Sequence, residues 1–123
     1  MLGTNDLKVR FSVSAFDIAN GAGVLVGIVQ KSETGHNNGS PRILLMAPPP
    51  LSKLTDFAEM FEGGAEKSRK LAGHYGRIAA EKGCHFLDSS QLLVSSDADG
   101  VHFDPEAHAA LGIAVARKVA EIL

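Results

Sequence analysis

Cysteine is scarce in this sequence, and long apolar runs are absent. Cys84 is the only cysteine among the 123 residues, which excludes an internal disulfide and favours a reducing compartment. The longest apolar runs, such as residues 24–29, are far shorter than the roughly 20 residues of a membrane-spanning helix. Met1 and Leu2 lead straight into polar residues, unlike a secretory signal peptide. We therefore expect a soluble cytoplasmic protein without a membrane partner.

The chain also lacks an excess of charge of either sign. Its formal net charge is −2 at pH 7, and acidic and basic residues are interspersed. A nucleic-acid-binding protein needs a basic face, so no nucleic-acid partner is expected. The hydrophobic fraction of 45% is ordinary for a globular protein, and the length allows one core and at most one domain.

Several common signatures of a catalytic or cofactor site are absent. Neither Gly-x-Ser-x-Gly nor Gly-Asp-Ser occurs, so the sequence contains no nucleophile elbow. No glycine-rich phosphate loop occurs either. His74, His85 and His108 do not have the spacing of zinc ligands around Cys84. We expect no cofactor and no metal ion, and we interpret Cys84 as a small buried hydrophobic residue.

Helix-like and strand-like segments alternate in the first half of the chain. Ser14 and Asp17 have the spacing of a capping box, which predicts a helix over residues 15–31. Residues 32–40 are rich in glycine and asparagine and indicate a loop. The apolar run 42–47 ends in three prolines, which a strand interior excludes, so it predicts a short buried parallel strand.

The same alternation continues to the C-terminus. A second helix is predicted over residues 66–82, with Gly83 as the residue that ends it. Residues 84–88 indicate a short strand. Asp104 is a good N-cap and Pro105 suits the first position of a last helix. Strands that alternate with helices predict an α/β fold with a parallel sheet.

The predicted sheet is incomplete. A strand leading into the N-terminal polar motif would be cut to Met1 and Leu2, which leaves two full strands. A parallel sheet needs several strands and helices on both faces to bury itself. We therefore expect an unpaired strand edge and exposed apolar faces, which favour association with a missing N-terminal segment or self-association into a homo-oligomer.

Asp99 and His102 form an Asp-x-x-His motif shortly before the last predicted helix. Histidine titrates near neutrality, so His102 could act as a general base. Asp99 could hold the imidazole tautomer and stabilise the imidazolium. In parallel sheets, functional residues gather beyond the carboxyl ends of strands, and this motif follows a strand-like region. The alternative is a polar loop that caps the helix.

Asn5 lies in a second polar motif, Gly3-Thr4-Asn5-Asp6. Its side-chain amide could donate a hydrogen bond to negative charge that develops on a substrate oxygen, and one such donor contributes about 3–4 kcal/mol to catalysis. Asparagine and aspartate also bond readily to their own backbone in turns. A simple turn is therefore the alternative interpretation.

A calcium-binding loop competes for the second motif. Ser95, Asp97, Asp99, Gly100 and Glu106 fall on the ligand and glycine positions of an EF-hand loop. This interpretation is disfavoured because the first ligand position is serine and because the preceding segment is strand-like, whereas an EF-hand needs a helix on both sides.

Taken together and in this order, the two motifs resemble those of the SGNH hydrolases, also called GDSL esterases. Residues 3–6 look like the third block of that family, Gly-x-Asn-Asp, and residues 99–102 look like its fifth block, Asp-x-x-His. Segments 16–19, 48–51 and 61–64 resemble the arylesterase and acyltransferase branch. The similarity runs over essentially the whole chain, which makes it far more specific than either motif alone.

This resemblance implies a flavodoxin-like three-layer α/β/α fold, of which residues 1–123 would be the C-terminal part of a single domain. It implies hydrolysis or transfer of short acyl groups carried by a small ester. By position, His102 would be the base, Asp99 its partner and Asn5 the oxyanion donor. The blocks that carry the nucleophilic serine and an oxyanion glycine would precede Met1, so we expect the chain alone to be inactive.

Three apolar residues between the motifs are candidates for lining an acyl pocket. They are Phe57, Met60 and Phe61, and packing in the core is their alternative use. The incomplete sheet also suggests a function of another class. The chain would then be a non-catalytic module that associates with itself or with a partner.

Overall fold

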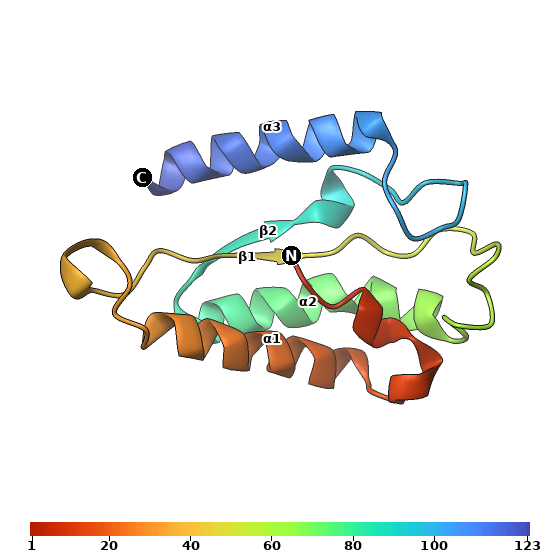
Figure 1. Cartoon of the computed structure of the whole chain (residues 1–123), viewed down its shortest axis with the longest axis horizontal. Coiled ribbons are helices and arrows are strands. Elements are labelled where there is room, and N and C mark those ends of the chain that lie inside the picture. Colours follow the sequence, from red (N-terminus) through yellow and green to blue (C-terminus); the bar gives the residue numbers. More distant parts are fainter.

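Helices lie on both sides of a two-stranded parallel sheet, and the computed structural model describes all residues 1–123 (Figure 1). On one side lie α1 (Ala15–Gln30) and α2 (Gly64–Lys82), and on the other lies α3 (Pro105–Ile122). The strands are β1 (Leu44–Ala47) and β2 (His85–Asp88), and short 3-10 turns are η1 (Asn5–Leu7), η2 (Val9–Phe11), η3 (His36–Asn38) and η4 (Ser89–Gln91). The predicted α/β architecture is confirmed.

The two strands run parallel, with Leu44 opposite His85 and Ala47 opposite Asp88. The connection between them contains α2, which contacts both strands. Both strands begin later than the predicted ranges 42–47 and 84–88. Because the sheet has two strands, each strand keeps one unpaired edge, as the sequence predicted.

The hydrophobic core lies mainly between α1, α2 and the strands. Leu7, Leu71 and Tyr75 are all buried, each 0% exposed, and they belong to one cluster of apolar residues. Gly23 lets α1 approach α2 closely, because a Cβ atom there would lie 3.1 Å from Cγ2 of Ile78. The core therefore depends chiefly on the pair α1 and α2.

The ends of α1 and α2 follow the capping chemistry of the sequence. The amide of Asp17 donates to Oγ of Ser14 over 3.1 Å, which satisfies a free donor of the first turn. Gly83 ends α2 in the left-handed region at φ +63°, as predicted. The start of α2 differs from the prediction, because Gly63, also left-handed at φ +70°, lets the helix begin at Gly64.

The last helix, α3, is held less firmly than the other two. Pro105 is its first residue and Asp104 is its N-cap, both as expected, but the Asp104 side chain makes no capping hydrogen bond. No residue of α3 is buried, and the guanidinium of Arg42 donates to the carbonyl of Ile122 at its end. None of the helices is both long and apolar enough to cross a membrane.

Candidate active site

Asp99 and His102 are joined directly. Nδ1 of His102 lies 2.6 Å from Oδ2 of Asp99, and a carboxylate accepts hydrogen bonds, so Nδ1 carries the proton. The other carboxylate oxygen, Oδ1, accepts from the amides of Val101 at 2.7 Å and His102 at 2.9 Å. Both oxygens of Asp99 are therefore used to fix the imidazole and the turn that carries it.

The free nitrogen of His102 is open to a reacting group. The side chain is 72% exposed. The hydrogen bond of the ring to Asp99 is made by Nδ1, and Nε2 makes no hydrogen bond within the chain. With the proton on Nδ1, Nε2 has an available lone pair. This is the tautomer that a general base needs.

The charge of Asp99 is stabilised by the groups that it binds. The hydrogen bond from His102, followed by those from the backbone amides of His102 and Val101, lowers the pKa of Asp99 to about 2. The carboxylate is therefore ionised throughout the neutral range. An ionised partner can stabilise the imidazolium that forms when His102 takes a proton.

Gly100 allows this turn to pack against the segment that follows β1. Its φ is +79°, and a Cβ atom would lie 2.6 Å from the carbonyl oxygen of Lys53. The amide of Ser52 donates to the Gly100 carbonyl over 2.9 Å, and the hydroxyl of Thr55 donates to the carbonyl of Ala98 over 2.9 Å. The segment after β1 therefore supports the Asp99–His102 turn along its length.

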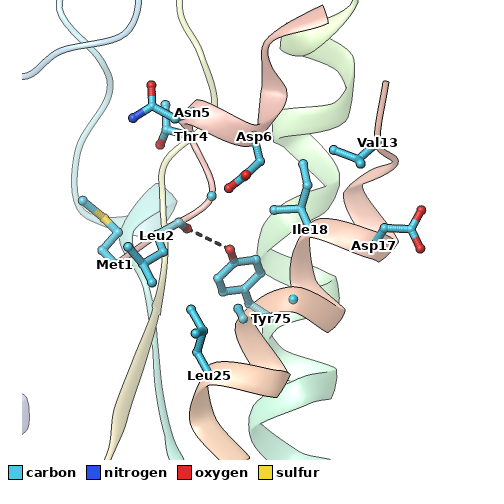
Figure 2. Close-up of a pocket in the computed structure, with 13 residues that line it drawn as sticks. Met1, Leu2, Thr4, Asn5, Asp6, Val13, Asp17, Ile18, Leu25 and Tyr75 are labelled. Carbon is cyan, nitrogen blue, oxygen red and sulfur yellow. Dashed lines mark hydrogen bonds between the residues drawn. The ribbon is translucent and has the colours of Figure 1, made fainter. Parts of the chain in front are cut away.

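Asn5 begins the turn η1 and is exposed. The turn is closed by backbone bonds from Asp6 to Gly3 over 3.1 Å and from Leu7 to Thr4 over 3.2 Å. The side chain of Asn5 points away from Tyr75 (Figure 2). Its amide makes no hydrogen bond in the chain, so it remains available as a donor to a ligand.

The segment between β1 and α2 also binds the chain just after the Asn5 turn, at the start of η2. The amide of Val9 donates to the carbonyl of Met60 over 2.9 Å, a few residues beyond the contacts with Gly100. The turn η1 and the loop that precedes α3 lie at the same end of the molecule (Figure 1). One loop thus bonds both to the Asp99–His102 turn and to Val9, two residues beyond the Asn5 turn.

The three candidate pocket residues have different environments. Phe57 is partly buried and lies edge-on to the His102 ring, with 6.1 Å between ring centroids. Met60 is 39% exposed. Phe61 is 2% exposed and belongs to the core cluster, so packing, the alternative use considered for it, is what the structure shows. Phe57 is the one nearest the candidate base.

The calcium-loop interpretation lacks its entering helix. Residues 92–96 are irregular, and the only helical element before them since β2 is the short turn η4. An EF-hand loop is flanked by a helix on each side. The segment from Ser95 to Glu106 is therefore described better as a turn that carries Asp99 and His102.

No serine of the chain is bonded to the free nitrogen of His102. The nearest in the hydrogen-bond network is Ser96, whose amide donates to the His102 carbonyl over 2.7 Å. Its own hydroxyl accepts from the amide of Ala98 over 3.1 Å, and the residue is 7% exposed. These 123 residues contain a candidate base, its carboxylate partner and a candidate amide donor, and no serine is hydrogen-bonded to the imidazole.

A cavity lies at the Asn5 turn rather than at His102, and Asn5 is one of its lining residues. It has a volume of about 650 Å³ and is lined by Leu2, Asp6, Ile18, Leu25 and Tyr75 among others (Figure 2). Sequence reasoning missed both this cavity and Tyr75, whose hydroxyl donates to the carbonyl of Leu2 over 2.8 Å. Tyr75 had the helical spacing of an ordinary core residue, so its polar contact gave no signal.

Comparison with known proteins identifies related structures. No protein-family model and no curated protein matches the chain. A carbohydrate acetylesterase from Sinorhizobium meliloti is 39% identical with a TM-score of 0.95, and an aryl esterase from M. smegmatis is 36% identical with a TM-score of 0.94. Each match covers 100% of this chain and 59% of the other.

The chain therefore spans less than two thirds of the length of the esterases that it matches. Within that span, the backbone of this chain superposes closely on those of the esterases, and more than a third of the residues are identical. The resemblance inferred from the two motifs and the segments between them is confirmed over the whole chain.

Proposed function

We propose, from the premise that this chain is similar over its full length to part of an SGNH-type esterase, that it supplies three groups to a carboxylic-ester hydrolase. His102 is the general base, Asp99 is the carboxylate that orients it, and Asn5 is a side-chain oxyanion donor. The observation that carries this proposal is the 2.6 Å contact between Nδ1 of His102 and Oδ2 of Asp99, which leaves Nε2 free.

The nucleophile comes from a serine outside these 123 residues. His102 takes the proton of that hydroxyl at Nε2 as the oxygen attacks the ester carbonyl, and then gives the proton to the leaving alcohol. The Asn5 amide donates to the oxyanion formed on the carbonyl oxygen. Water then attacks the acyl-enzyme with His102 again as base, which releases the acid and regenerates the serine.

The proposed substrates are short acyl esters, with acetate esters first among them. The names of the similar structures, carbohydrate acetylesterase and aryl esterase, support a small acyl group on either a sugar or a phenol. Transfer of the acyl group to an alcohol instead of water is the alternative outcome of the same chemistry. A cytoplasmic location is also proposed, supported by the single cysteine, Cys84.

The proposed partner is the polypeptide segment that carries the serine. Leu2 is 59% exposed, Val24 62%, Leu25 48% and Ile28 60%, although all four are apolar. We call Val24, Leu25 and Ile28 the α1 outer face. Together with the unpaired edge of β1, this surface suits a strand and helix of a larger sheet. A second copy of the chain is the alternative occupant, as in a self-associating module.

A mixing experiment tests the proposed function. The chain is combined with a serine-carrying N-terminal segment of an SGNH esterase, and hydrolysis of an aryl acetate is followed. We expect activity in the mixture, and we expect His102→Ala to reduce kcat by several orders of magnitude, since the members of a triad act as a unit. Exposed His36→Ala, in the loop before β1, is the control and leaves kcat unchanged. Activity that survives His102→Ala rejects the proposal.

A further inference from the structure

We propose that Tyr75 is a positioning residue for Asn5, an inference that rests on the proposed function because it gives Asn5 the oxyanion role. Tyr75 is on α2, far from Asn5 in sequence, and it is not exposed. Its hydroxyl donates to the carbonyl of Leu2 over 2.8 Å. That carbonyl belongs to the residue before Gly3, where the Asn5 turn begins (Figure 2).

Gly3 brings the backbone of the turn directly onto the phenol. Its φ is +112°, and a Cβ atom would lie 2.4 Å from the Tyr75 hydroxyl oxygen and 3.1 Å from Cγ2 of Ile18. A side chain at this position could not fit without moving the turn. The first end of the turn is therefore fixed both by a hydrogen bond to Leu2 and by close packing at Gly3.

The second end of the turn has its own buried anchor. Leu7 is not exposed and belongs to the core cluster, and its amide donates to the carbonyl of Thr4 over 3.2 Å. Asn5 thus lies on the exposed outer side of a turn whose two ends are held in the core. An oxyanion donor acts only if it is held where charge develops, and holding it in advance removes the cost of reorganisation.

The phenol is suited to a fixed role rather than a titrating one. Burial, with a smaller effect of the nearby Asp6 charge, raises the pKa of Tyr75 to about 12. The hydroxyl therefore stays protonated and remains a donor at every pH at which an esterase works. Tyr75 does not itself reach toward the side of the turn on which Asn5 projects (Figure 2), so its effect passes through the backbone.

Tyr75→Phe isolates this effect, because it keeps the buried ring and removes one hydroxyl. In the 123-residue chain, we expect faster amide hydrogen exchange at Asp6, Leu7 and Lys8, whose hydrogen bonds close the turn. Ile78→Val is the matched control: it lies on the same helix, is 3% exposed and contacts Gly23 rather than the turn. Equal exchange at these amides in the two variants overturns the inference.

Kinetics of the chain combined with the serine-carrying segment give the second readout. We expect Tyr75→Phe to lower kcat about tenfold with KM nearly unchanged, because a small misplacement of a catalytic group costs rate rather than binding. In an Asn5→Ala background the same substitution should have little further effect. A loss of kcat that persists without Asn5, or that Ile78→Val reproduces, shows a general structural role and rejects the inference.

The two readouts separate the inference from the proposed function. If the wild-type mixture has no esterase activity, the proposed function fails. Hydrogen exchange in the chain alone then still decides whether Tyr75 holds the turn that carries Asn5.

Discussion

Asp99 divides its two oxygens between two tasks. Oδ1 accepts from the amides of Val101 and His102, which shapes the turn, and Oδ2 accepts from Nδ1 of His102, which sets the tautomer. Sequence reasoning anticipated the second task from the Asp-x-x-His spacing alone. The first task depends on backbone conformation at Gly100, and a motif does not describe that.

Asp99→Asn should reverse the tautomer of His102. An asparagine oxygen that keeps the bonds from the Val101 and His102 amides turns its NH₂ group toward Nδ1, which must then accept. The proton moves to Nε2 and the base is lost. Imidazole ¹⁵N chemical shifts of the chain at alkaline pH measure this directly, and the corresponding loss of kcat in the assembled esterase is about 10⁴-fold.

Asp97→Asn is the control for that substitution. Asp97 is exposed, lies two residues away and contributes no side-chain hydrogen bond to the loop, so it should leave the ¹⁵N shifts of His102 unchanged. Persistence of the Nδ1-protonated form in Asp99→Asn is incompatible with the role assigned to Asp99.

The lowered pKa of Asp99 has a defined consequence for stability. Because the pKa falls from 3.8 to about 2 on folding, the folded chain binds this proton more weakly than the unfolded chain does. The stabilisation is fully present above about pH 4 and is lost as the pH falls through 2. Carboxyl ¹³C shifts should therefore titrate for Asp99 with a midpoint near 2.

His102→Ala provides the comparison for this titration. The imidazole hydrogen bond is the largest cause of the lowered pKa of Asp99, so its removal should raise the midpoint toward 3.8. A midpoint that stays unchanged in His102→Ala means that the backbone amides alone hold the carboxylate, and the direct pairing is then wrong.

At the scale of elements, the segment between β1 and α2 joins the two motif turns. It bonds to the Asp99–His102 turn through Ser52 and Thr55, and through Met60 to Val9, just after the Asn5 turn. From the sequence, this segment offered candidate pocket residues and two stretches, 48–51 and 61–64, that resemble the esterase branch. Its supporting role comes from backbone hydrogen bonds, which any residue type can make, so composition could not reveal it.

Gly100→Ala should disrupt the packing of the Asp99–His102 turn against the segment between β1 and α2. The substitution places a Cβ atom 2.6 Å from the Lys53 carbonyl oxygen and also imposes φ +79° on a non-glycine residue. We expect a loss of about 2–3 kcal/mol in the free energy of unfolding, measured with denaturant.

Gly63→Ala separates the two causes. Gly63 also has positive φ, +70°, but no atom lies within 4 Å of the Cβ position. It should cost only about 1 kcal/mol, the backbone strain of the left-handed conformation. If Gly63→Ala and Gly100→Ala lower the free energy of unfolding equally, the close contact with Lys53 adds nothing to the cost at Gly100.

Local rules predicted the ends of the elements better than their packing. The bond between Ser14 and Asp17, the left-handed Gly83 and the first-turn Pro105 are all present as predicted, because each depends on neighbours in sequence. The start of α2 differs from the prediction, and Asp104 is at the predicted N-cap position without a capping bond from its side chain. The environments of Tyr75 and Phe61 depend on residues far away in the chain. The sequence spacing of apolar residues alone does not distinguish a residue that lines a pocket from one that only packs in the core.

At the scale of the whole molecule, the exposed α1 outer face and the open edge of β1 favour association. Light scattering of the chain at micromolar concentration should report a species larger than a monomer. Val24→Lys with Ile28→Lys should shift it to the monomer, because charge on an apolar contact opposes burial. Ile113→Lys is the control, since Ile113 is also exposed (56%) but lies on α3. A cooperative wild-type monomer contradicts the proposed docking role.

The central claim is that this chain holds a base, its carboxylate partner and an oxyanion donor, while the nucleophile lies elsewhere. Hydrolysis of an aryl acetate by the purified 123-residue chain tests it most directly. Loss of the nucleophile lowers turnover by on the order of 10⁶-fold, so we predict a rate indistinguishable from the buffer blank. Robust hydrolysis that His102→Ala abolishes would contradict the claim and would require a serine within the chain to act on His102.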